Sequence, residues 1–179
     1  MARLETQIHQ IYLLSPDTKN NNLILHEEVL SPTAHLFILL EINSAGSKVL
    51  PGDIRKISEI ITETFNANKK LTKDTLFESS LAEINQGLAD LAHSGRKNWL
   101  GRFSGLVALK SSDSLFLANS GSASAYLKRQ DQISEILQSE KEGLHPLKTF
   151  TNFVSGKIKE GDELVVVSKK IFNYVSPSL

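Results

Sequence analysis

The chain has 179 residues, of which 40% are hydrophobic and 22% are charged, and its 20 basic residues balance its 20 acidic ones. These values are typical of one globular domain over residues 1–179, either complete or as a fragment of a longer chain. The balanced charge argues against a nucleic-acid partner. The absence of cysteine excludes disulfides, cysteine-ligated zinc and thiol chemistry.

The N-terminal segment lacks the features of a secretory signal. Residues 1–14 contain charges inside their apolar run and so do not form an uninterrupted hydrophobic region. No other run approaches the ~18 apolar residues that a membrane span requires. The sequence therefore predicts a cytoplasmic protein without a membrane segment.

The first half of the chain predicts strands followed by two helices. Short apolar runs at 7–14, 23–30 and 35–42 are bounded by turn-forming residues, which favours strands. Residues 51–68 and 73–93 repeat apolar side chains at three- and four-residue spacing, and each segment therefore predicts an amphipathic helix. Two consecutive helices of this length predict a hairpin that covers one face of a sheet.

Predicted strands dominate the second half. They lie at 103–110, 114–119, 123–129, 132–137, 150–159 and 162–168, and a further helix is predicted to begin near residue 170. Strands, a helix pair and strands again indicate an α+β fold. Such a fold contains one sheet, or two stacked sheets, flanked by helices.

Two segments resemble a known family. Residues 103–127 read FSGLVALKSSDSLFLANSGSASAYL, and residues 158–172 read IKEGDELVVVSKKIF. Both are similar, in hydrophobic framework and in order along the chain, to segments of the metal-dependent protein phosphatases of the 2C or PPM type. The resemblance implies an αββα sandwich of mainly antiparallel sheets flanked by a helix hairpin, truncated at the C-terminus relative to the family.

The charged residues of that family are not matched here. Active members use carboxylates to hold two divalent cations, Mg²⁺ or Mn²⁺, and a water that bridges the cations attacks a phosphoryl group. When this chain is aligned on the resemblance, the positions of the family's metal site fall on Asn22, Glu41, Ile42, Ser122, Lys169 and Lys170.

These replacements imply a site that has lost its metals. Glu41 keeps a carboxylate, but Ile42 is expected to fill space where the family has a glycine. Lys169 places an ammonium group where the family has a ligand, so repulsion of a cation replaces attraction. We therefore predict a pseudophosphatase with no catalytic residue and no metal cofactor. Either Lys169 or Lys170 forms a salt bridge with Glu41 across the former metal cleft, or both lysines point to solvent.

The resemblance then predicts a regulatory or scaffolding module that binds other proteins. Its partner is another protein or a second copy of the chain, bound through a sheet edge or a helix face. Two alternatives remain open. One is a metal-dependent phosphatase with rearranged ligands around Glu41, and the other is an anion- or phosphopeptide-binding module in which Lys169 or Lys170 grips the anion.

Other polar clusters fit structural roles better than chemical ones. His26 and Glu28 share one face of a predicted strand, which is typical of a solvated surface. The loop at 96–102 is basic and contains Trp99. We expect Trp99 to be anchored in the core and the basic residues to be solvated, with a phosphate site in this loop as the alternative.

Overall fold

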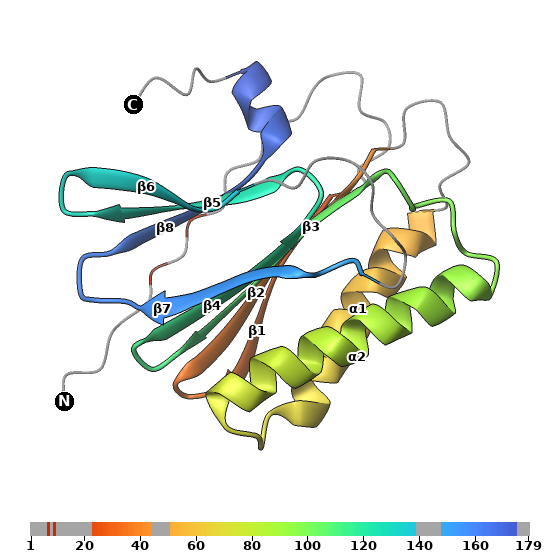
Figure 1. Cartoon of the computed structure of the whole chain (residues 1–179), viewed down its shortest axis with the longest axis horizontal. Helices are drawn as coiled ribbons and strands as arrows, with labels where there is room; N and C mark the ends of the chain where they lie inside the picture. The colour runs from red at the N-terminus through yellow and green to blue at the C-terminus, as the bar shows by residue number, and fades with distance from the viewer. Residues whose placement is uncertain (1–6, 8, 10–22, 44–50, 139–147, 175–179) are drawn as a thin grey trace.

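The computed structural model describes residues 7, 9, 23–43, 51–138 and 148–174 (Figure 1). In chain order, its elements are β1 (Leu23–Ser31), β2 (Ala34–Ile42), α1 (Pro51–Asn68), α2 (Lys73–His93), β3 (Phe103–Ser111), β4 (Ser114–Ser120), β5 (Ala123–Arg129), β6 (Gln132–Leu137), β7 (Asn152–Lys157), β8 (Glu163–Ser168) and the short 3-10 helix η1 (Lys169–Asn173). The α+β prediction is confirmed. The predicted strand at 7–14 falls on residues of which only two are described, and the helix predicted from residue 170 is η1.

The strands form two antiparallel sheets. The larger sheet has the order β1-β2-β3-β4-β7, and the smaller sheet has the order β6-β5-β8. In Figure 1 the helix pair lies against the larger sheet, and the smaller sheet lies on the side away from the helices. The described elements therefore stack as a helix layer followed by two sheet layers, and η1 lies beyond the smaller sheet.

Alternation along the strands divides the core into two layers. Side chains on one face of the larger sheet pack under the helices with Phe65, Phe77 and Trp99, all of which are almost fully buried. Side chains on the opposite face, among them Leu106 and Leu117, pack against the smaller sheet. Successive strand residues point to opposite faces, so a single strand such as β3 supplies both layers.

The helix pair is anchored to the sheet by apolar packing. Helix α2 alone buries nine residues along one side, including Phe77, Leu81, Ile84 and Leu88. This stripe is the one that the helical spacing of the sequence predicts. Among the described residues, no helix is both long enough and apolar enough to cross a bilayer.

An arginine–aspartate pair joins the turns at one end of the smaller sheet. Arg129, the last residue of β5, donates from Nε to Asp162 Oδ1 over 2.9 Å and from Nη2 to Asp162 Oδ2 over 2.7 Å. The same Nη2 donates to the carbonyl of Lys157, at the end of β7 in the other sheet. These hydrogen bonds from Arg129 lower the pKa of the Asp162 carboxyl from 3.8 to about 2.

This pair should make the free energy of unfolding depend on pH. The pKa of Asp162 is depressed in the folded state, so its contribution is present above about pH 4 and is lost as the pH falls towards 2. We expect a contribution of about 1–2 kcal/mol, since the partial exposure of Arg129 weakens the pair. Urea unfolding between pH 2 and 6 should show a steep loss for the native sequence and a shallower one for Asp162→Asn.

Glu163→Gln is the matched control. Glu163 forms an ion pair with Lys128 over 2.6 Å, but 60% of the Glu163 side chain is exposed, so its removal should change little. If Asp162→Asn loses as much free energy of unfolding between pH 6 and 2 as the native sequence does, the Arg129–Asp162 pair does not cause the pH dependence.

Candidate functional site

The candidate site lies where β2 of the larger sheet and β8 of the smaller sheet end. Glu41 is the second-last residue of β2, and Ser168 is the last residue of β8. The Ser168 hydroxyl donates to Glu41 Oε2 over 2.6 Å, although the two residues are 127 positions apart in the chain. This hydrogen bond joins the two sheets at the position where the family's metal ligands were aligned.

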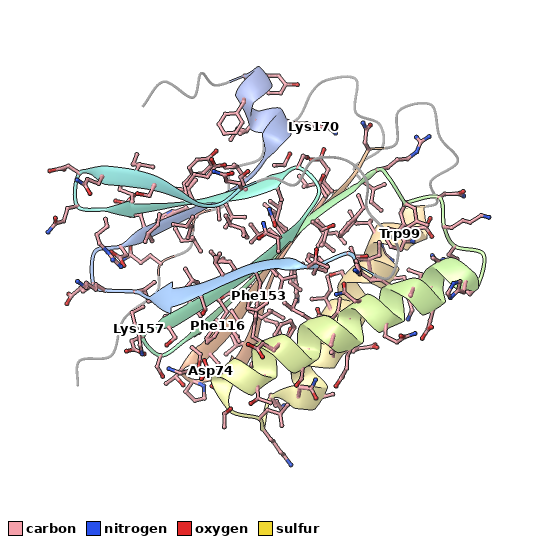
Figure 2. All side chains as sticks on the ribbon, in the orientation of Figure 1. Asp74, Trp99, Phe116, Phe153, Lys157 and Lys170 are labelled. Carbon is pink, nitrogen blue, oxygen red and sulfur yellow. The ribbon has the colours of Figure 1, made fainter. Side chains whose placement is uncertain are left out.

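Lys170 completes the contact. Its Nζ forms an ion pair with Glu41 Oε1, the carboxylate oxygen that Ser168 does not use. The Ser168 hydroxyl also accepts a hydrogen bond from the backbone N–H of Lys170, and so caps the start of η1. The Glu41 side chain is only 14% exposed, whereas that of Lys170 is 54% exposed. Lys170, labelled in Figure 2, therefore reaches in from η1 at the surface to neutralise a largely buried carboxylate.

Two serines lie next to this pair. Ser104 of β3 is directly opposite Glu41 in the β2–β3 register. Its hydroxyl lies 2.8 Å from that of Ser122 and accepts the backbone N–H of Ser122 over 3.1 Å. Ser122 follows Gly121, at the corner between β4 and β5. Ser104 therefore connects two parts of the site. It lies beside Glu41 in the sheet, and it hydrogen-bonds to Ser122 at the corner between β4 and β5.

Gly121 is required for this corner. Its φ angle is +69°, in the left-handed region that glycine adopts most readily. A Cβ at this position would lie 2.5 Å from the carbonyl oxygen of Phe103 and 2.9 Å from Ser104 Oγ. The close approach brings Ser122 into hydrogen-bonding range of Ser104.

The structure brings together some of the predicted site residues. The predicted salt bridge across the cleft is confirmed for Lys170 and Glu41. Ser122 reaches the cluster through Ser104. Asn22 lies outside the described residues, as does the side chain of Lys169.

Ile42 lies on the helix side of β2, and the expectation that it fills the space of the family's glycine stays a prediction. Its side chain is 2% exposed and belongs to the core under the helices. Ile42 follows Glu41 in the same strand, so the two side chains point to opposite faces of the sheet. Ile42 therefore does not fill space beside the Glu41 carboxylate.

The described residues of this cluster do not fit a two-metal centre. Mg²⁺ and Mn²⁺ prefer several oxygen ligands, usually with more than one carboxylate. The described cluster has a single carboxylate, and its two oxygens are taken by Ser168 and Lys170. Nowhere in the described part of the chain do three or more histidine, aspartate or glutamate side chains gather as a metal ligand set would.

The basic loop at 96–102 has a structural role. Trp99 is 1% exposed, as predicted, and its Nε1 donates to the carbonyl of Arg96 over 2.7 Å. The Arg96 guanidinium binds the buried carboxylate of Asp53, in the first turn of α1, with Nε and Nη2 at 3.0 and 2.9 Å from Oδ1. Arg96 is therefore engaged within the fold.

The two histidine–carboxylate pairs lie on β1 and β2. His26 Nε2 lies 3.3 Å from Glu28 Oε2 on the helix side of β1, which confirms that these two side chains converge. His35 Nδ1 lies 3.0 Å from Glu27 Oε1 on the opposite face. Each pair has one histidine and one carboxylate, so each fits a surface hydrogen bond better than a metal site.

Sequence reasoning missed the roles of Ser104 and Ser168. Serine is common in strands and turns, and neither residue stands out by type. A signal for Ser168 existed, because it directly precedes the two lysines in the segment that resembles the family. The role of Ser104 depends on strand register, which the sequence pattern does not set by itself.

Solved structures with the same fold are phosphatases. No family model and no curated protein matches the sequence. The serine/threonine phosphatase Stp1 from Staphylococcus aureus superposes with a TM-score of 0.73 at 14% identity, covering 99% of this chain and 82% of that one. A bacterial serine phosphatase variant superposes with a TM-score of 0.71 at 16% identity, covering 89% and 74%. The chain has the fold of the PP2C-type phosphatases.

One PP2C-fold neighbour is described as a regulator. PppA, a key regulatory component of the T6SS in Pseudomonas aeruginosa, superposes with a TM-score of 0.58 at 11% identity and covers 80% of this chain and 69% of that one. These identities are low, so the likeness is one of fold. The expected PP2C-like architecture is thereby confirmed at the level of the fold.

Proposed function

We propose that this chain is a catalytically inactive PP2C-like domain that acts as a regulatory or scaffolding module through protein contacts. The ion pair between Lys170 and Glu41 is the observation that carries the proposal. The proposal includes a cytoplasmic location and no requirement for Mg²⁺ or Mn²⁺. It also includes no nucleic-acid partner, in keeping with the zero net charge of the chain.

Electrostatics supports the loss of the metals. A dication that approached Glu41 would have to displace the Lys170 ammonium group from the carboxylate. The dication would then lie close to that ammonium group, which repels it. The hydroxyl of Ser168 competes for the second carboxylate oxygen. The described cluster is therefore neutral and internally satisfied, whereas a two-metal site gathers negative charge.

The arrangement also supports a retained scaffold. A carboxylate that is 14% exposed costs free energy unless a partner neutralises it. Lys170 supplies the positive charge from within the chain, so the two sheets stay joined at this end without a bound ion. A fold maintained in this way keeps its surfaces for binding, and the name of PppA shows that the same fold occurs in a regulatory component.

The proposal predicts no phosphatase turnover. With an aryl phosphate as substrate and MnCl₂ or MgCl₂ added, the native chain should show no hydrolysis above background, and neither metal should raise its melting temperature. Lys170→Ala frees the Glu41 carboxylate, so we expect weak metal-dependent stabilisation, still without turnover because two ions need more ligands. Lys97→Ala, which removes an exposed lysine in the loop after α2, is the matched control and should behave as the native chain does.

Two results would contradict this proposal. Manganese-dependent turnover by the native chain that is lost in Glu41→Gln would support a phosphatase with rearranged ligands. Stabilisation by inorganic phosphate or a phosphopeptide that is lost in Lys170→Ala would instead support an anion-binding module.

A further inference from the structure

Among the described residues, the edge strand β7 has outward backbone groups for which no described strand is a partner. It is the last strand of the larger sheet, and its one neighbour among the described strands is β4. The Ile158 N–H donates to the carbonyl of Asp113, in register with the β4–β7 ladder, so even-numbered residues of β7 direct their backbone groups towards β4. Phe153 and Ser155 therefore direct their N–H and C=O groups away from the sheet, where a further strand would lie.

The centre of β7 lacks the devices that usually protect an edge. Exposed edge strands in soluble proteins commonly carry charged residues or proline at their centre, which discourage pairing with another chain. The opposite edge of the same sheet, β1, has His26, Glu27 and Glu28 at its centre. In β7 the four central residues, 153–156, are Phe-Val-Ser-Gly, and the one charged residue is Lys157 at the end.

An exposed aromatic side chain accompanies these backbone groups. Phe153 is 46% exposed, and its ring lies 6.5 Å from that of Phe77 on α2. Figure 2 shows Phe153 in the space between β7 and the helix. Gly156, also on β7, has open space where a side chain would be. In the described part of the chain, β7 therefore combines outward hydrogen-bonding groups with an exposed aromatic ring on the helix side.

We propose that β7 pairs antiparallel with β7 of a second copy of this chain, extending the larger sheet across a two-fold axis at Val154. In this register Phe153 lies opposite Ser155 of the second copy, and the reverse pair forms as well. The two pairs use the outward N–H and C=O groups of both residues, giving four backbone hydrogen bonds. Paired residues share a face, so each Phe153 ring packs over a small serine side chain.

The helices leave room for this arrangement. Phe77 of α2 contacts Phe116 of β4 at 5.5 Å as well as Phe153, which places α2 above β4. In the dimer, the two β4 strands are three strand spacings apart, or about 14 Å. A helix with its side chains is about 10 Å across, so the two copies of α2 flank a slot. The proposed pairing places the two Phe153 rings in that slot.

A second copy fits the edge better than a partner of another kind because the edge is self-complementary. The same two residues supply donors and acceptors on both sides of the axis. The charges next to the strand are satisfied within one chain, since Lys157 forms an ion pair with Asp113 over 2.7 Å. In the proposed register Lys157 lies opposite Thr151 of the second copy, so the two Lys157 side chains are not paired with each other. The dimer gives a partner to the interaction role proposed above, and in that sense it rests on that proposal.

Sedimentation velocity of the full chain over a concentration series tests the pairing. We expect a reversible dimer, with slow amide hydrogen exchange at Phe153 and Ser155 that becomes faster as the protein is diluted. Ser155→Lys places a charge on an exposed side chain beside the Phe153 ring of the other copy. It should weaken the dimer at least about tenfold without unfolding the monomer.

Val165→Lys is the matched control because it puts the same charge on another exposed strand residue, in β8 at an edge of the smaller sheet. It should leave the dimer intact. A native chain that stays monomeric up to about 100 µM, a dimer that Ser155→Lys does not weaken, or a dimer lost in Val165→Lys would each overturn the proposal. If the chain is monomeric, the dimer proposal fails but the proposal of an inactive domain does not. If the chain shows metal-dependent turnover, the proposal of an inactive domain fails but the dimer proposal does not.

Discussion

Arg96→Ala should lower the free energy of unfolding by about 3 kcal/mol, because it leaves the Asp53 carboxylate buried without its cationic partner. The Asp53 side chain is 1% exposed, so water cannot replace the guanidinium. The position of Asp53 in the first turn of α1 recovers part of the loss, since a helix N-terminus favours negative charge. Urea denaturation monitored by circular dichroism measures the change.

The cause can be separated from a general effect of the loop. Lys97→Ala removes the neighbouring basic residue, which is exposed, and should change stability by less than about 0.5 kcal/mol. In an Asp53→Asn background, the loss from Arg96→Ala should be clearly smaller because no buried charge remains to be neutralised. Equal losses in both backgrounds would show that the Arg96 side chain acts through packing rather than through Asp53, since the backbone carbonyl that Trp99 contacts remains in the variant.

Phe77→Ala should have a comparable or larger effect, about 3–5 kcal/mol. Phe77 is fully buried, and its ring lies 6.0 Å from that of Phe65 on α1 and 5.5 Å from that of Phe116 on β4. This one side chain therefore connects both helices to the larger sheet, and its removal leaves a cavity that rigid neighbours cannot fill. Such a loss is a large part of the total stability of a domain, about 5–15 kcal/mol.

Phe172→Ala provides the comparison for Phe77→Ala. Phe172 is a partly buried residue of η1 with a described ring contact to Tyr126 at 6.4 Å, so the loss should be about 1 kcal/mol. If both variants lose the same amount, the aromatic cluster under α2 does not dominate the attachment of the helices. Thermal unfolding at one protein concentration measures both.

Phe77, the Arg96–Asp53 pair and the Glu41 cluster hold different parts of the fold together. The helix layer is fixed by Phe77 and by Arg96–Asp53, at a distance from the cleft along the chain. The ends of β2 and β8 are joined by the contacts among Glu41, Ser168 and Lys170. Substitutions that weaken these contacts should therefore change the response to metal ions more than the free energy of unfolding. Function and folding can then be measured separately.

The secondary structure was largely readable from the sequence. Helices α1 and α2 have the predicted bounds, because their apolar stripes repeat at helical spacing and turn-forming residues end them. The strand predicted at 150–159 is shorter, Asn152–Lys157, because pairing with β4 and not composition sets its ends. The resemblance to the 2C-type phosphatases gave the two-sheet architecture, which hydrophobic pattern alone left as one sheet or two.

The candidate site was only partly predictable. The resemblance singled out Glu41 and Lys170, and their contact was one of two arrangements considered. The roles of Ser104 and Ser168, and the direction of Ile42, depend on which face of a strand each residue occupies and on which strand lies opposite. A shift of one residue in register would exchange those faces, so residue type alone could not decide them.

The sequence by itself determined the helices and most of the strands, because these follow from residue type and short-range spacing. Only the tertiary structure placed Lys170 beside Glu41, showed that Ser168 shares the carboxylate, and put β7 at an edge among the described strands. Those features join segments more than a hundred residues apart, or depend on strand order. Both are set by packing and hydrogen bonding across the whole fold, and no local pattern carries that information.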